Sequence, residues 1–94
     1  MIKNFKDNET AKIYRQRKST KLPQDIQKTS LRKLMMIDNA AKLDDLRMPP
    51  ANHLEKLSGD RAGQYSIRIN DKYRICFRVD EAANCYDVEI VDYH

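Results

Sequence analysis

The chain has 94 residues, of which 40% are hydrophobic and 34% are charged, and its formal net charge is +4. This length predicts one compact domain over residues 1–94, because a second core would need more chain. No apolar run approaches the ~20 residues of a membrane-spanning helix, and the first residues lack the apolar stretch of a signal peptide. We therefore expect a cytoplasmic protein without membrane contact.

The positive charge is concentrated near the amino terminus. Seven of the 18 basic residues and only two of the 14 acidic ones fall within residues 1–21, which gives this segment a balance of +5. Such a segment is typical of proteins that bind a polyanion, either nucleic acid or an acidic protein surface. A solvated helix face has the same composition, so charge alone does not choose between these interpretations.

The first half of the chain predicts a strand followed by two helices. Residues 1–6 alternate in polarity as a short strand does, and Asp7-Asn8 offers a cap for a helix over residues 9–17. Pro23 suits the first turn of a second helix, which an apolar stripe extends to about residue 45. A Pro-Pro pair then prevents the helix from continuing.

The second half changes to a period of two, which indicates strands. They are expected over residues 53–57, 64–69, 73–79 and 85–93. The whole order predicts an α+β domain in which two helices cover one face of a mainly antiparallel sheet of about five strands.

Cys76 and Cys85 fall in the last two predicted strands. The expected register separates them by several residues, and at ~3.4 Å per residue this exceeds the reach of a disulfide. Two cysteines and two histidines in the whole chain do not suggest a structural zinc site. We predict two free, packed thiols and neither a metal nor another cofactor.

A three-residue loop sets the register of the strands over residues 64–69 and 73–79. It pairs Ile69 with Tyr73 and places Arg68 directly opposite Arg74, on a face that we expect to be open and turned away from the helices. Like charges in this position destabilise a sheet, so either a carboxylate separates them or the site binds an anion.

The last strand supplies candidates for both explanations. The expected pairs are Val79–Tyr86, Arg78–Asp87, Cys76–Glu89 and Arg74–Val91. Asp87 then neutralises Arg78, while Glu89 and Tyr93 both lie diagonal to Arg74. Strict alternation sends Asp92 and His94 to the opposite side, so only a twist or bulge at the strand end would gather all three terminal groups.

An arginine, a tyrosine and a histidine that converge can cleave RNA without a metal. Arginine holds phosphate oxygens, and histidine transfers protons near neutral pH. A tyrosine needs a neighbouring cation to serve as a base. The same residue types at a strand end also serve purely structural roles.

Several segments of the chain form a specific set. They are residues 1–5, 46–50, 52–68, 73–77 and 88–94, with Gly59-Asp60-Arg61, Tyr65-Ser66-Ile67 and Asp92-Tyr93-His94 the most distinctive. In these segments the chain resembles, over essentially its whole length, the HigB toxins of the RelE-type toxin–antitoxin superfamily. The resemblance implies a growth-arresting ribonuclease that cuts mRNA in the ribosomal A site.

The resemblance also implies roles and partners. Arg74 would stabilise the phosphate and the transition state, Tyr93 and His94 would transfer protons, and Asp92 would orient or tune its neighbours. The implied partners are the ribosome, mRNA and a cognate helix-turn-helix antitoxin, with operator DNA bound only through the antitoxin complex.

The chain departs from the family pattern before the Gly-Asp-Arg loop. Some members carry a His and a Lys there, where this chain has Glu55 and Ser58. His53 and Lys56 lie two residues earlier, and they are either substitutes for the missing pair or bystanders. The general base therefore stays open. We take His53, Lys56, Arg61 and Arg68 as candidate RNA-binding residues, although Arg61 can instead serve only its own loop.

Two other functions are compatible with these residues. The first is a non-catalytic basic binding module, a co-repressor subunit that works with a DNA-binding antitoxin and needs neither Tyr93 nor His94. The second is a ribonuclease that acts without the ribosome. The small set of acid–base groups argues against high intrinsic activity, because the ribosome would have to help position the RNA.

Overall fold

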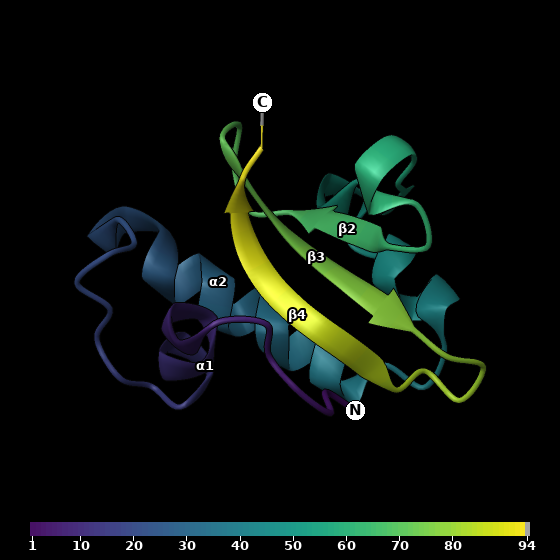
Figure 1. Cartoon of the computed structure of the whole chain (residues 1–94), viewed down its shortest axis with the longest axis horizontal. Helices are drawn as coiled ribbons and strands as arrows, with labels where there is room; N and C mark the ends of the chain where they lie inside the picture. Colours follow the sequence, from purple (N-terminus) through teal and green to yellow (C-terminus); the bar gives the residue numbers. More distant parts are fainter. Residues whose placement is uncertain (94) are drawn as a thin grey trace.

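The computed structural model describes residues 1–93 (Figure 1). The helices are α1 (Asn8–Tyr14) and α2 (Gln24–Asn39), and the strands are β1 (Glu55–Lys56), β2 (Tyr65–Arg68), β3 (Tyr73–Val79) and β4 (Cys85–Asp92). Three short 3₁₀ turns lie between α2 and β2: η1 (Leu43–Arg47) and η2 (Pro50–Asn52) before β1, and η3 (Gly59–Arg61) after it. Within residues 1–93, no helix combines the length and the apolar character needed to cross a bilayer.

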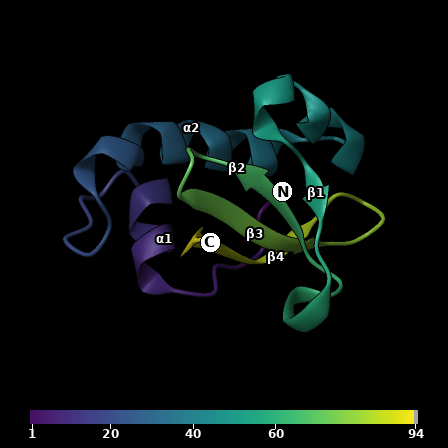
Figure 2. The same ribbon diagram turned by 90° about the horizontal axis from the view of Figure 1, so that it is seen from above.

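The strands form one antiparallel sheet in the order β1-β2-β3-β4. Helix α2 lies across one face of this sheet, and η3 projects on the other side (Figure 2). Ile67, Ile75 and Phe77 are fully buried in the core that the sheet and the helices share. The predicted α+β fold is confirmed.

Helix α1 begins where the sequence predicts. The Asp7 carboxylate accepts a hydrogen bond from the Thr10 amide at 2.6 Å and so caps the first turn. The helix ends at Tyr14, earlier than predicted, because Gln16 adopts a left-handed conformation with φ of 60°. The Arg17 amide then bonds back to a carbonyl of the last turn, as in a Schellman motif.

Helix α2 is shorter than predicted. It ends at Asn39 rather than near residue 45, and the chain resumes as η1. A carboxylate is unfavourable at the carboxyl end of a helix and favourable in the first turn of a new one. The Asp45 carboxylate accepts from the amides of Ala41 and Lys42 at 2.9 and 3.2 Å, which stabilises the break.

The amino-terminal segment runs beside β4 without becoming a strand of the sheet. The two isolated parallel bridges are Ile2–Cys85 and Phe5–Val88. Between them Asp87 has φ of 52°, and its amide donates to the Asn4 side chain at 3.0 Å rather than to backbone. The sheet of the described residues therefore has four strands instead of about five.

The register of β4 changes around Asp87. The predicted pairing of β2 with β3 is confirmed, including Arg68 opposite Arg74. Between β3 and β4 the predicted pairs Cys76–Glu89 and Arg74–Val91 are confirmed, whereas the observed pairs Arg78–Tyr86 and Val79–Cys85 differ by one residue from the prediction. The bulge around Asp87 adds one residue to β4, and a period-two pattern does not reveal it.

Candidate active site

The candidate site is built on the face of the sheet opposite α2, where the register sets side chains in two rows. The first row is Glu55, Ser66, Cys76 and Glu89, one from each strand. The second row is Arg68, Arg74 and Val91. We predicted an open face, and this was wrong. Ser66 and Cys76 are fully buried, and Arg74 is only 8% exposed.

Arg74 is held by acceptors on three sides. Its Nε donates to Ser66 Oγ at 2.8 Å, and its Nη2 donates to the His53 carbonyl at 2.5 Å. Its Nη1 lies 3.8 Å from Glu55 Oε1. Since each guanidinium nitrogen has a neighbour, the orientation of the group is set before any ligand arrives.

Tyr93 covers the guanidinium. The Cζ atom of Arg74 lies 5.7 Å from the centre of the Tyr93 ring, within the range of a cation–π contact. The Tyr93 amide donates to the Lys72 carbonyl at 2.7 Å, which ties the end of β4 to the β2–β3 turn. The sequence prediction that Tyr93 lies diagonal to Arg74 agrees with this contact.

Separate carboxylates explain how Arg68 and Arg74 lie side by side. Arg68 Nη2 donates to Asp71 Oδ1 in the adjacent turn, and Arg74 faces Glu55. We had expected the last strand to supply the carboxylate beside Arg74. The repulsion is instead relieved from the turn and from the edge strand β1.

Glu89 pairs with other cations than predicted. It lies 3.5 Å from Arg61 Nη2 and 3.4 Å from Lys6 Nζ. Arg61 also donates to Gln64 Oε1 at 3.0 Å, so much of its bonding serves the η3 loop. The predicted contact of Asp87 with Arg78 is present at 3.6 Å, although the two are not ladder partners.

The structure places Asp92 on the other side of β4 from Tyr93. It is the ladder partner of Tyr73, and its carboxylate lies 3.6 Å from Lys72 Nζ. The bulge occurs near Asp87, and no register shift is present between it and Asp92. The predicted role of His94 falls outside the described residues.

His53 and Lys56 do not replace the family's His and Lys in position. His53 follows η2 in a left-handed conformation, outside β1, and it faces Arg74 through its carbonyl while the residue as a whole is exposed. Lys56 is the partner of Tyr65 and so lies on the opposite side of β1 from Glu55. A displacement of two residues preserves a face only within a strand.

Burial disfavours the thiolate form of both cysteines. Both cysteines are free and buried, as predicted. Burial raises the pKa of the Cys85 thiol to about 11, and burial likewise raises the pKa of Cys76. Among residues 1–93, no three His, Cys, Asp or Glu side chains gather as metal ligands would.

Sequence reasoning missed two residues of this site. Ser66 and Glu55 both contact Arg74. In the sequence, each is indistinguishable from an ordinary polar residue of a strand. The period of two, once the register is set, places both of them in the row beside Arg74. The sequence could therefore have predicted these contacts, but only if the first residue of β1 were known.

Comparison with known proteins identifies the family of the chain. Residues 3–94 match the sequence model of the HigB-like toxins, RelE-like toxins of the type II toxin–antitoxin system HigB. Toxin HigB-1 of Vibrio cholerae is 39% identical over 79 residues, 83% of each chain. An uncharacterised protein of Haemophilus influenzae is 37% identical over 86 residues, which covers 88% of this chain and 85% of its own.

The fold is also similar to that of a solved structure. A chain in the heterotetrameric YoeB–YefM toxin–antitoxin complex of Staphylococcus aureus aligns with a TM-score of 0.51 and 22% identity, covering 81% of this chain and 91% of that one. At this identity the likeness concerns the fold alone. On its sequence, the chain belongs to the HigB-like family, the RelE-like toxins of type II toxin–antitoxin systems.

Proposed function

We propose that this toxin is a ribosome-dependent mRNA endonuclease that cuts in the ribosomal A site and arrests growth. One observation carries the proposal: Arg74 is buried, bonded to Ser66 and to the His53 carbonyl, and in cation–π contact with the Tyr93 ring. A guanidinium fixed in advance beside a phenol suits a reaction in which negative charge develops on a phosphate.

The proposed reaction is attack of a ribose 2′-hydroxyl on the adjacent phosphate. A base takes the hydroxyl proton, a P–O bond forms, and the bond to the 5′ oxygen breaks as an acid protonates that oxygen. Arg74 stabilises the equatorial oxygens, and Tyr93 and His94 exchange the protons. Asp92 tunes the end of β4 through Lys72.

Glu55 is a further candidate for the base. Its carboxylate lies 3.8 Å from Arg74 Nη1, and its side chain is half exposed, so it is open to a substrate hydroxyl. Glu55→Gln preserves the shape of the side chain and removes its ability to accept a proton. A loss of cleavage in this variant supports Glu55, whereas unchanged cleavage leaves the proton transfers to Tyr93 and His94.

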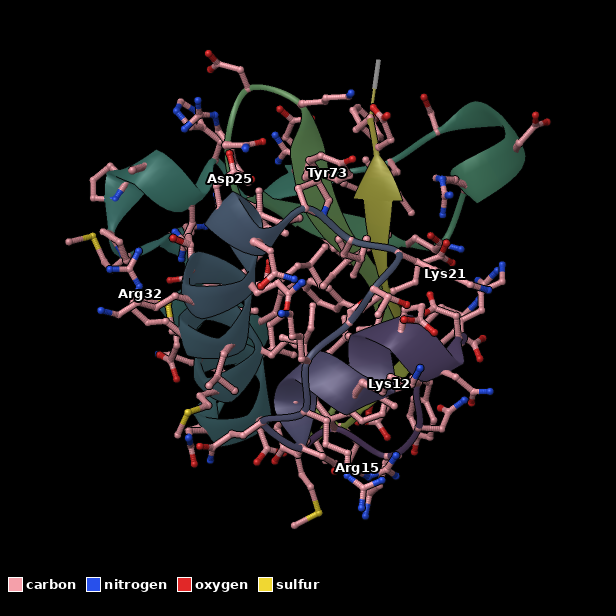
Figure 3. All side chains as sticks on the ribbon, turned by 90° about the vertical axis from the view of Figure 1, so that its left-hand side faces the viewer. Lys12, Arg15, Lys21, Asp25, Arg32 and Tyr73 are labelled. Atoms are coloured by element: carbon pink, nitrogen blue, oxygen red, sulfur yellow. The ribbon has the colours of Figure 1, made fainter. Side chains whose placement is uncertain are left out.

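Substrate and ribosome contacts are proposed for basic residues around and behind this site. Arg68, Arg61, Lys56 and His53 lie on the strands and loops that border it. The helical side adds six exposed cations, namely Arg15, Arg17, Lys18, Lys21, Lys28 and Arg32. Figure 3 shows Arg15, Lys21 and Arg32 pointing away from the helices. Such groups bind RNA phosphates without regard to sequence.

The proposed partners follow from the family. We propose a cytoplasmic toxin that is neutralised by a cognate helix-turn-helix antitoxin and that contacts operator DNA only through this complex. The YoeB–YefM complex, whose toxin–antitoxin assembly its structure records, supports an antitoxin partner by its similar fold.

Mapping of mRNA 5′ ends tests the proposal. Purified protein is incubated with programmed ribosomes and, in parallel, with the same mRNA alone. We expect cuts at A-site codons only when ribosomes are present. Cuts on naked RNA would instead indicate a free ribonuclease.

A non-catalytic co-repressor is the second candidate, and the bonding of Arg74 is the observation that favours it. All three guanidinium nitrogens already have acceptors, as in a structural arginine. This function predicts no cuts in either tube, together with operator binding that needs toxin and antitoxin.

A further inference from the structure

A buried lysine and a buried asparagine bond to each other behind the candidate site. Lys33, in α2, is 4% exposed, and Asn52, at the end of η2, is fully buried. The Lys33 ammonium donates to Asn52 Oδ1, while the Asn52 amide donates to the carbonyls of Leu46 and Met48 at 3.1 and 3.3 Å. Asn52 therefore uses both ends of its side chain to connect α2 to the η1–η2 segment.

Asn52 directly precedes His53, whose carbonyl contacts Arg74. The His53 backbone is left-handed with φ of 43° and ψ of 58°. That conformation accompanies the 2.5 Å contact between the His53 carbonyl and Arg74 Nη2. This carbonyl belongs to the His53–Leu54 peptide, so a backbone shift at Asn52 and His53 would displace the acceptor from the guanidinium.

Stability alone is a poor reason for a lysine at this position. Among the described residues no carboxylate lies within ion-pair distance of Lys33, and its one side-chain acceptor is a neutral amide oxygen. Burial lowers the pKa of Lys33, with added repulsion from Arg32 and Arg68. A buried cation without a counter-charge costs free energy, whereas an apolar side chain of similar length would not.

We propose that Asn52, held by Lys33, is a positioning residue for Arg74. Lys33 fixes the amide of Asn52, Asn52 fixes the η1–η2 segment, and the His53 carbonyl then holds Nη2 while Ser66 holds Nε. In this proposal Asn52 acts only through Arg74. The functional part of this inference rests on the proposed endonuclease activity.

The first test observes Arg74 directly. In protein with ¹⁵N-labelled arginine, the Arg74 Nε–H signal reports its bond to Ser66 and its position over the Tyr93 ring. We expect Asn52→Ala to shift this signal and to accelerate exchange of its proton. Lys33→Met keeps the side-chain length without the ammonium, and we expect the same shift and the same faster exchange. This variant replaces Asn52→Ala in the test if Asn52→Ala folds poorly.

Gln27→Ala is the matched control. Gln27 is also a side-chain amide that ties α2 to a connecting segment, since it donates to the carbonyls of Ser19 and Leu22 at 3.0 and 2.9 Å. It lies near the other end of α2 and has no contact with the site. We expect its loss to lower thermal stability while the Arg74 signal stays in place. An Arg74 signal that is unmoved in Asn52→Ala and Lys33→Met would overturn the proposal.

The second test uses cleavage on programmed ribosomes under single-turnover conditions. We expect Asn52→Ala to reduce the maximal rate by roughly 10- to 100-fold, the scale of a small misplacement of a catalytic group, with half-saturation nearly unchanged. In an Arg74→Ala background the same substitution should have no further effect. An equal effect in both backgrounds would show that Asn52 does not act through Arg74.

The two tests separate two kinds of failure. If the wild-type protein cuts no RNA with ribosomes, the proposed activity fails, and the Arg74 signal still decides whether Asn52 positions the guanidinium. If the wild type is active and the signal is unmoved in both variants, only the positioning role fails.

Discussion

At the scale of single residues, Arg74 shows how a charged side chain becomes part of a sheet. It is 8% exposed, and its three nitrogens face a hydroxyl, a backbone carbonyl and a carboxylate. Lysine carries the same charge on a single nitrogen and cannot reach three acceptors in a fixed plane. The geometry therefore depends on the guanidinium group rather than on positive charge.

We predict that Arg74→Lys lowers the rate of ribosome-dependent cleavage by roughly 100-fold, because the phosphate would lose a planar, positioned set of N–H donors. Single-turnover cleavage measures the rate, and antitoxin binding reports that the variant is folded. Arg78→Lys is the control, since Arg78 is an exposed arginine of the same strand. Wild-type cleavage by Arg74→Lys would contradict the role proposed for the guanidinium.

At the scale of elements, Asp38 joins α2 to the amino-terminal segment. Its carboxylate accepts from the Ile2 amide at 2.8 Å and from the Tyr14 hydroxyl at 2.7 Å. The Ile2 bond first, and the Tyr14 bond second, hold the pKa of Asp38 below its ordinary value of 3.8. One residue therefore connects the segment beside β4 with both helices.

We predict that Asp38→Asn lowers the free energy of unfolding by about 2 kcal/mol at neutral pH, the scale of bonds to a charged group. The pKa is lower in the folded state, so the stabilisation is complete above 3.8 and is lost as the pH falls through the lower folded value. Urea unfolding over this range should show the two proteins converging. Glu81→Gln, at an exposed turn, is the control. A difference in free energy of unfolding between wild type and Asp38→Asn that stays constant with pH would contradict the prediction.

At the scale of the whole molecule, the charge is arranged on two sides. The candidate site lies on one face of the sheet, where most arginines have acceptors of their own. The helical side carries the six exposed cations named above, and among residues 1–93 none of their side chains has a carboxylate within ion-pair distance. A surface of this kind suits a long polyanion better than a small substrate.

Charge reversal on the helical side should therefore weaken binding to ribosomes and leave the chemical step intact. We expect Lys18→Glu with Lys28→Glu to reduce affinity and to flatten its dependence on salt by roughly 0.7–0.9 in log–log slope for each phosphate that the variant no longer neutralises. Association measured at several salt concentrations tests this. The control is Lys42→Glu with Arg47→Glu, beyond the carboxyl end of α2, and an equal reduction of affinity in both pairs would contradict a localised surface.

The sequence by itself determined the fold class, the cap at Asp7-Asn8, the pairing of β2 with β3 and the position of Tyr93 diagonal to Arg74. These features depend on periodicity, on capping chemistry and on the length of one turn, all of which act over a few residues. The predicted end of α2 was wrong. The apolar stripe continues to about residue 45, but the helix ends at Asn39 and the Asp45 carboxylate accepts from the Ala41 amide.

Only the tertiary structure decided what surrounds Arg74. The His53 carbonyl lies 21 residues from Arg74 along the chain, and Lys33 reaches Asn52 across 19 residues. The bulge at Asp87 likewise depends on Asn4, which is 83 residues away. Backbone acceptors are the same at every position of a sequence, so a site built on one becomes visible only when packing selects which carbonyl is close.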